Sequence, residues 1–155
     1  MIAARLLCVP LGMNSAASWP SIATRLIRDG IISPEAAAGA EVLHAFGTLT
    51  GNSDMHNGNL SFMGEAAQPY ALAPAYDMLP MAFAPRGGAS LPDRLPPLRL
   101  DPSVSPQTWR RALRLAQEFV IALSSDDRFT PGWAVCRDAL AQHVKDAAGV
   151  IGRLG

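Results

Sequence analysis

The chain has 155 residues, of which 49% are hydrophobic and 17% charged, a balance typical of a folded domain and unlike that of a disordered chain. Its 13 basic and 13 acidic residues cancel, which argues against direct binding to nucleic acid or to an anionic membrane. The apolar runs fall short of the ~20 residues that a membrane-spanning helix needs. Cys8 and Cys136 form no C-x-x-C pair, so we expect free thiols and a cytoplasmic protein.

The first part of the chain predicts two helices after a segment of uncertain structure. Residues 1–18 weakly resemble a secretory signal, but Pro10 and Gly12 interrupt the apolar run, so we expect no export. A short helix is predicted over Trp19–Asp29, with Ser18 as its possible N-cap. The helix that follows should start at Pro34, with Ser33 as its cap, and end at Gly51.

A β-hairpin and a proline-rich loop are predicted next. The stretches "LSFM" and "YALA" are strand-like and flank a loop centred on Ala66 and Ala67. Nine of the 13 prolines lie between Pro69 and Pro106, so residues 80–105 are expected to form a long surface loop. The glycines of "RGGAS", residues 86–90, are typical of a flexible loop rather than of a phosphate-binding turn.

Two further helices are predicted at the C-terminal end, beginning at Pro106 and at Pro131. Each carries an apolar stripe that should be buried in a core, and Trp133 belongs to the second stripe. His143 lies in the same helix, and we expect it at the surface. The chain as a whole is thus expected to be mainly α with one short β-hairpin.

The stretch "TGNSDMHNGNLSF", residues 50–62, crowds short polar side chains into an otherwise apolar chain. One interpretation is structural, because Asn, Ser, Asp and Gly commonly end helices and build tight turns. The other interpretation is a functional site. His44, in the preceding helix, could reach such a site, although a lone histidine in a helix is more often packed.

A lone carboxylate further along the chain favours the site interpretation. Asp77 lies in the apolar run "ALAPAYDMLP", and the predicted hairpin would bring Asn59 opposite the neighbourhood of Pro74. Asp54 and Asp77 would then leave the hairpin at the same open end. Two carboxylates and a carboxamide are ligands that suit Mg²⁺. The order of these residues, with an Asn five positions after the first Asp and a second Asp after a hairpin, is that of a protein-kinase catalytic loop and metal-binding segment.

These two segments resemble the catalytic and metal-binding segments of HipA-type serine/threonine kinases, particularly the YjjJ-like branch. The resemblance implies that Asp54 is the catalytic aspartate, His56 a supporting residue, and Asn59 and Asp77 the residues that bind Mg²⁺ and, through it, ATP. It also implies that residues 19–155 are the helical C-terminal lobe of a two-lobed kinase. Many family members are bacterial toxins that act beside a helix-turn-helix antitoxin and phosphorylate cytoplasmic proteins. Gly58 departs from the family pattern, which often has lysine there.

Parts of a complete kinase are missing from the sequence. Upstream of Asp54 there is no G-x-G-x-x-G motif and no lysine, and the single lysine of the chain is Lys145. We therefore expect the nucleotide-binding lobe to be absent and the isolated chain to be inactive. The missing lobe or an antitoxin would be its partner, and the protein substrate is unknown.

Two alternatives to a kinase lobe stay open. One is a non-catalytic interaction remnant, or pseudokinase domain. The other, ranked last, is a metal-dependent hydrolase that uses Asp54, His56 and Asp77. If a lobe is missing, an apolar surface should be exposed, formed by four side chains near the polar cluster: Leu60, Phe62, Leu72 and Tyr76.

Overall fold

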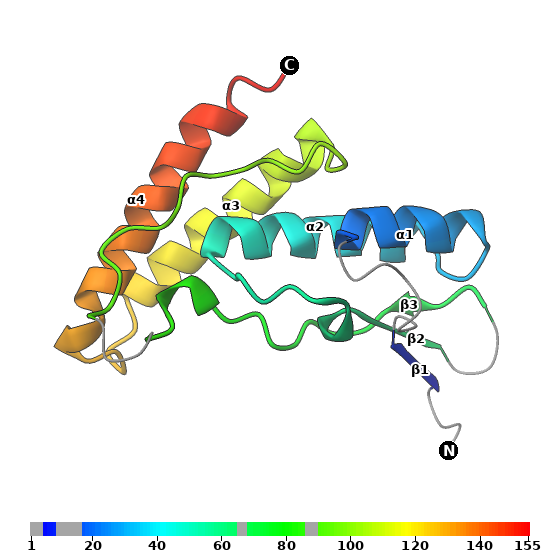
Figure 1. The fold of residues 1–155 in the computed structure, drawn as a ribbon, viewed down its shortest axis with the longest axis horizontal. Coiled ribbons are helices and arrows are strands. Elements are labelled where there is room, and N and C mark those ends of the chain that lie inside the picture. The colour runs from blue at the N-terminus through cyan, green and yellow to red at the C-terminus, as the bar shows by residue number, and fades with distance from the viewer. Residues whose placement is uncertain (1–4, 9–16, 65–67, 86–89) are drawn as a thin grey trace. The chain divides into compact units, whose positions relative to one another are not determined.

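The computed structural model describes residues 5–8, 17–64, 68–85 and 90–155. Its helices and strands, in chain order, are β1 (Arg5–Cys8), α1 (Trp19–Arg28), α2 (Pro34–Thr50), β2 (Ser61–Gly64), β3 (Ala71–Leu72), α3 (Pro106–Ser124) and α4 (Ala134–Ile151) (Figure 1). Short 3-10 turns occupy Asn57–Asn59 (η1), Met81–Phe83 (η2) and Pro131–Trp133 (η3). The prediction of a mainly α chain with a short β-hairpin is confirmed.

The starts of α2 and α3 follow from capping residues. The Ser33 hydroxyl accepts a hydrogen bond from the Ala36 amide at 3.1 Å. The Ser105 hydroxyl likewise accepts one from the Thr108 amide at 3.1 Å. A proline follows each cap at the first helical position, where its missing N–H has no intrahelical partner to lose. Both starts agree with the sequence prediction.

The chain divides into two compact units, and α2 belongs to both. Unit 1 consists of Met1–His44 and Met55–Met78, and unit 2 of Ala45–Asp54 and Leu79–Gly155. The first division therefore lies inside a continuous helix, between His44 and Ala45.

Unit 1 contains a three-stranded antiparallel sheet in the order β1-β2-β3. The strand β1 was not predicted, and it pairs along β2 with Leu7 opposite Phe62. In the predicted hairpin Phe62 faces Leu72, and continuing this register places Leu60 opposite Pro74. Asn59 then falls opposite Ala75, in the neighbourhood of Pro74 as predicted. The turn at Ala66 lies outside the described residues.

The core of unit 1 joins α1, α2 and β2. Trp19 and Phe62 are completely buried, and Leu60 is nearly so. The expectation of an exposed apolar surface is therefore wrong for Leu60 and Phe62, because both side chains pack in one cluster with Trp19. Tyr76 alone of the four expected side chains is largely exposed, at 42%.

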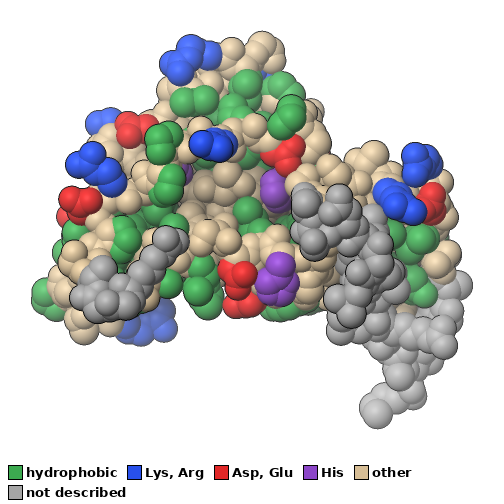
Figure 2. Space-filling model, in the orientation of Figure 1, with side chains coloured by type: hydrophobic (Ala, Val, Ile, Leu, Met, Phe, Trp, Pro, Cys, Tyr) green, Lys and Arg blue, Asp and Glu red, His purple; other side chains and the backbone are tan. Residues whose placement is uncertain are grey.

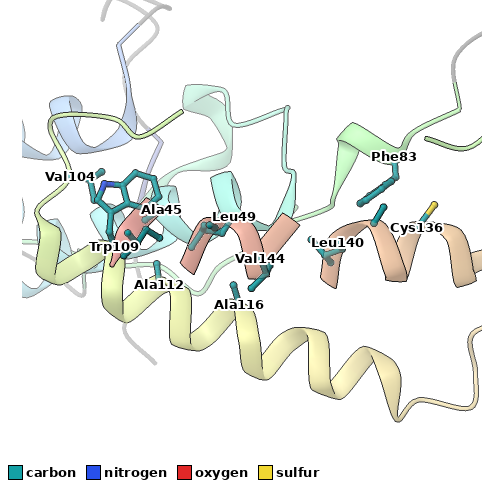
Figure 3. Packing of buried hydrophobic residues seen from close by; sticks show 13 residues of the cluster. Ala45, Leu49, Phe83, Val104, Trp109, Ala112, Ala116, Cys136, Leu140 and Val144 are labelled. Atoms are coloured by element: carbon teal, nitrogen blue, oxygen red, sulfur yellow. The ribbon is translucent and has the colours of Figure 1, made fainter. Parts of the chain in front are cut away.

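The core of unit 2 lies between α3, α4 and the end of α2, and its side chains are seen close by in Figure 3. Trp109 and Ala112 of α3 and Leu140 and Val144 of α4 are buried in it. His143 is buried as well, contrary to expectation, because it lies on the same α4 face as Leu140 and Val144.

Trp133 corrects a second expectation for the last helix. It is 45% exposed instead of buried. The residues Pro131–Trp133 form the 3-10 turn η3, and α4 begins only at Ala134, so Trp133 is not part of the buried stripe. Its ring instead makes an edge-to-face contact with Phe129, with the ring centroids 6.3 Å apart.

The proline-rich segment is irregular, as predicted, apart from η2, and its described residues are exposed or half-buried except for Phe83 and Val104. Residues 90–104 run along α3 and α4 in Figure 1. Phe83 and Val104 are buried in the unit 2 core, at 3% and 5% exposure. The half-buried side chains that pack on the same core are Leu91, Leu95, Leu98 and Leu100. Residues 86–89 of the predicted glycine loop lie outside the described part of the chain.

Charged side chains are scattered over the part of the surface that Figure 2 shows in colour, with both signs mixed. No helix in the described ranges is long and apolar enough to cross a membrane.

Candidate functional site

The polar cluster begins with a helix-ending motif in unit 2. Gly51 has a φ of +77°, the left-handed conformation that glycine adopts without steric cost. The Asn52 amide donates to the carbonyl of Gly47 at 2.8 Å, and the Gly51 amide donates to that of Thr48 at 3.4 Å. These are the two hydrogen bonds of a Schellman motif. The structural interpretation is therefore right for Gly51 and Asn52.

A second turn connects this motif to Asp54. The Asn52 side-chain oxygen accepts a hydrogen bond from the Asp54 amide at 2.9 Å, as in an Asx turn. Asn52 is 4% exposed, so it holds the turn from a buried position. The Asp54 side chain is exposed. Local turn chemistry thus presents the predicted catalytic carboxylate at the surface of unit 2.

His56 and Asn59 belong to the turn η1 in unit 1. The Nδ1 atom of His56 accepts a hydrogen bond from the Gly58 amide at 3.0 Å, which leaves Nε2 to carry the proton of the neutral ring. The His56 carbonyl accepts from the Asn59 amide at 3.1 Å. It also accepts from the buried indole Nε1 of Trp19 at 3.2 Å. The first helix therefore anchors the turn that carries Asn59.

Position 58 has room only for glycine because the His56 ring lies beside it. A Cβ atom at position 58 would lie 2.9 Å from Cε1 and 3.0 Å from Nδ1 of His56. Any larger residue would force the imidazole to move and would weaken its hydrogen bond to the Gly58 amide. The imidazole thus fills the space beside the position where the resembled kinases often have lysine.

Tyr76 and Ser61 are functional candidates that the sequence reasoning missed. The Tyr76 hydroxyl donates to the Gly58 carbonyl at 2.5 Å. It also lies 2.8 Å from the Ser61 hydroxyl at the start of β2. These bonds tie the segment before Asp77 to the turn before Asn59. The only available signal was a tyrosine beside a lone aspartate in an apolar run.

Asp77 has an uncommon backbone conformation. Its φ is +52°, in the left-handed region, which non-glycine residues adopt rarely and aspartate more readily than most. Conformations of this kind gather at functional sites because the surrounding structure must hold them. The Asp77 side chain is exposed, and that of Asn59 is half-buried.

The structure thus brings two of the four predicted site segments together by hydrogen bonds. A hydrogen bond joins Tyr76 to Gly58. Asn59 directly follows Gly58 and Asp77 directly follows Tyr76, and all four residues belong to unit 1. Their shared metal pocket stays a prediction. Asp54 belongs to unit 2, and its convergence with the other residues also stays a prediction.

Metal-binding groups are limited in the described ranges. They contain no group of three or more His, Cys, Asp and Glu side chains that could hold a metal ion, which is the kind of group that the hydrolase alternative needs. A Mg²⁺ site needs fewer protein ligands, since one or two carboxylates with water and phosphate complete it. His44 lies with its ring 6.3 Å from that of Trp19, as expected for a packed histidine.

Comparison with known proteins assigns the chain to a family. Residues 14–148 match the model of the HipA-like C-terminal domain. The chain is 35% identical to the protein named Toxin YjjJ of Escherichia coli (strain K12) over 143 residues. That alignment covers 92% of this chain and 32% of Toxin YjjJ, so the chain spans about a third of the length of this relative. No solved structure matches the chain. The chain therefore belongs to the HipA-like C-terminal domain family.

Proposed function

We propose that the chain forms the catalytic and metal-binding segments of a HipA-like serine/threonine protein kinase, with Mg²⁺ and ATP as its cofactors. Asp54 would accept or orient the substrate hydroxyl, and Asn59 and Asp77 would hold Mg²⁺ on the ATP phosphates. His56 would support the catalytic turn. Family membership and the order of these residues along the chain both favour these roles.

The observation that carries the proposal is the hydrogen bond from the Tyr76 hydroxyl to the Gly58 carbonyl. One Mg²⁺ ion can be shared by Asn59 and Asp77 only if their two chain segments adjoin. The segments are 18 residues apart at this bond, yet unit 1 joins them there, and Ser61 strengthens the junction. The left-handed backbone of Asp77 adds support, because such conformations gather at functional sites.

The chemistry would rest on positioning and charge. Mg²⁺, when bound, neutralises charge on the phosphates. The Asn59 carboxamide oxygen and the Asp77 carboxylate are hard oxygen donors of the type that Mg²⁺ prefers. Asp54 is exposed after its Asx turn, and its carboxylate would accept a hydrogen bond from an incoming serine or threonine hydroxyl.

We also propose that the chain needs a partner to complete the nucleotide site. Its sequence has no glycine-rich loop and no lysine before Asp54, and those groups hold the phosphates in a kinase. A nucleotide-binding lobe would supply them. A helix-turn-helix antitoxin is the other partner that the family implies, and the cytoplasm is the proposed location.

The isolated chain is therefore expected to show no phosphoryl transfer. Purified protein would be incubated with Mg²⁺, radiolabelled ATP and a general protein substrate. Half of the phosphate-positioning groups are absent, and positioning supplies most of the catalysis. Transfer that Asp54→Asn abolishes would show instead that the chain is complete by itself.

A chimera tests the catalytic role directly. The segment of Toxin YjjJ that this chain matches would be replaced by residues 14–148, and growth inhibition and autophosphorylation would be measured in parallel. Asp54→Asn should abolish both effects, whereas Asp127→Asn, at another exposed position of unit 2, should abolish neither. A chimera that inhibits growth equally with and without Asp54 would favour the interaction remnant over the kinase.

A further inference from the structure

Tyr76 is held in unit 1 mainly by the hydrogen bonds of its hydroxyl group. The residue is 42% exposed and is not among the side chains that form or pack against the unit 1 core, so its ring contributes little to that core. Its oxygen nevertheless has two partners, the Gly58 carbonyl at 2.5 Å and the Ser61 hydroxyl at 2.8 Å. A largely exposed tyrosine held by its hydroxyl contributes orientation more than hydrophobic stabilisation.

The direction of the hydrogen bonds follows from the groups involved. A carbonyl oxygen can only accept, so the single Tyr76 proton goes to Gly58. Ser61 must then donate its proton to the Tyr76 oxygen. Consecutive hydrogen bonds of this kind polarise one another and strengthen the series. Because Ser61 is 3% exposed and lies in β2, the series is anchored in the sheet.

The series acts on both proposed metal ligands through their chain neighbours. Gly58 is the middle residue of η1, directly before Asn59. Tyr76 directly precedes Asp77, whose φ of +52° is unfavourable for an L-residue and must be held by its surroundings. Fixing the Tyr76 side chain fixes the approach of the backbone to Asp77.

We propose that Tyr76 is a positioning residue that orders Asn59 and Asp77 for Mg²⁺ through its hydroxyl, with Ser61 as its support. The metal part of this inference rests on the proposed function. Residues that orient metal ligands typically affect metal affinity about 10–100-fold when they are removed. Tyr76 would orient the two ligands and would make no bond to the metal itself.

The first arm of the test needs no metal. In the full chain, Tyr76→Phe keeps the ring and removes only the hydroxyl, and NMR reports the result. The amide order parameter of Asp77 should fall from the value of a rigid backbone toward that of a flexible segment. The Asn59 amide, bonded to the His56 carbonyl at 3.1 Å, should exchange with solvent at least tenfold faster. Tyr70→Phe, which removes a tyrosine hydroxyl elsewhere in unit 1, should change neither signal.

The second arm uses Mn²⁺ as a paramagnetic probe, since it prefers the same oxygen ligands as Mg²⁺. In the unsubstituted chain the Asn59 and Asp77 amides should broaden together along one titration curve. Tyr76→Phe should weaken this binding about tenfold or more. Ser61→Ala, which leaves the bond from Tyr76 to Gly58, should cause a smaller loss, and the melting temperature should change little in either variant.

The outcomes separate the two proposals. An unchanged Asp77 order parameter, unchanged Asn59 exchange and unchanged Mn²⁺ affinity in Tyr76→Phe would overturn the role of Tyr76. Loosening of the turn with weakened Mn²⁺ binding supports both proposals. If the unsubstituted chain shows no broadening at Asn59 and Asp77, the metal role fails together with the proposed function. A lower Asp77 order parameter and faster Asn59 exchange in Tyr76→Phe would then still establish that its hydroxyl orders the two segments.

Discussion

The helices α3 and α4 and the polar segments around Asn59 and Asp77 are built on opposite principles. The helices place an apolar face in a core, with Trp109 and Ala112 at 1% exposure or less. The polar segments bury little and depend on individual hydrogen bonds, such as that from Tyr76 to Gly58. Hydrophobic burial tolerates small shifts, whereas a series of hydrogen bonds has one working geometry.

This difference predicts which substitutions lower stability and which change the geometry of the site. Removal of a buried side chain from unit 2 costs stability in proportion to the surface and cavity it leaves. Removal of a polar group from the segments of unit 1 costs little stability and changes geometry instead. The three predictions below test this separation, from the largest expected effect to the smallest.

Trp109→Ala should destabilise the chain by about 3–5 kcal/mol, because a completely packed indole is replaced by a cavity. Urea denaturation followed by circular dichroism measures the loss. The matched control is Trp133→Ala, whose side chain is 45% exposed and packs mainly on Phe129. That variant should lose about 1 kcal/mol or less. Equal losses in the two variants would contradict the burial pattern of unit 2.

Asp77 allows stability and site geometry to be separated at one position. Asp77→Gly and Asp77→Ala both remove the carboxylate, so both should abolish the Mn²⁺ broadening at Asn59. Only alanine is disfavoured at a φ of +52°, and Asp77→Ala should be less stable than Asp77→Gly by about 1 kcal/mol. Thermal unfolding of the two variants side by side gives the difference. If alanine is tolerated as well as glycine, the backbone there is not left-handed in solution.

His143 should make unit 2 weakly sensitive to acid. Burial lowers its pKa below the ordinary value of 6.5, although Asp146 opposes this shift. Below pH 6.5 the unfolded chain therefore binds more protons than the folded chain, and the free energy of unfolding falls as the pH falls. Above that pH the full contribution of the neutral ring is present. The slope cannot exceed about 1.4 kcal/mol per pH unit for a single group.

Thermal unfolding between pH 7.5 and 5.0 measures this effect. The unsubstituted chain and His143→Gln would be measured under the same conditions. The variant should show a flatter dependence on pH. A variant that loses stability with acid as steeply as the unsubstituted chain would exclude His143 as the cause.

Local signals account for the parts of the fold that could be predicted. Ser33 and Ser105 cap α2 and α3 as expected, because a cap and the proline after it lie within a few residues of one another. The strand β1 could not be found in this way, since its partner β2 is more than 50 residues away. Trp133 was misplaced because the 3-10 turn η3 comes before α4 and shifts the start of the helix. His143 was misplaced because histidine is polar by type, although its position falls on the buried face of Leu140 and Val144.

The candidate site was proposed from residue type and spacing, whereas the hydrogen bonds that support its segments are seen only in the structure. Asp54, Asn59 and Asp77 were identified from a kinase-like order along the chain. The hydroxyl series from Ser61 through Tyr76 was not, because a tyrosine in an apolar run is ordinarily assigned to packing. The turn chemistry of Gly51 and Asn52 leaves Asp54 exposed, so the structural interpretation of the polar cluster does not exclude the site interpretation.

The continuity of α2 across both units has a consequence for dissecting this protein. The chain leaves unit 1 within a helix, between His44 and Ala45, returns to it at Met55 and leaves it again after Met78. Each unit is therefore assembled from two separate stretches of sequence, and no single cut yields either one whole. A cut at the first crossing would also break the hydrogen-bonded backbone of α2. Fragment expression or domain shuffling must therefore treat β1 through α4 as one genetic module, even though two cores stabilise it.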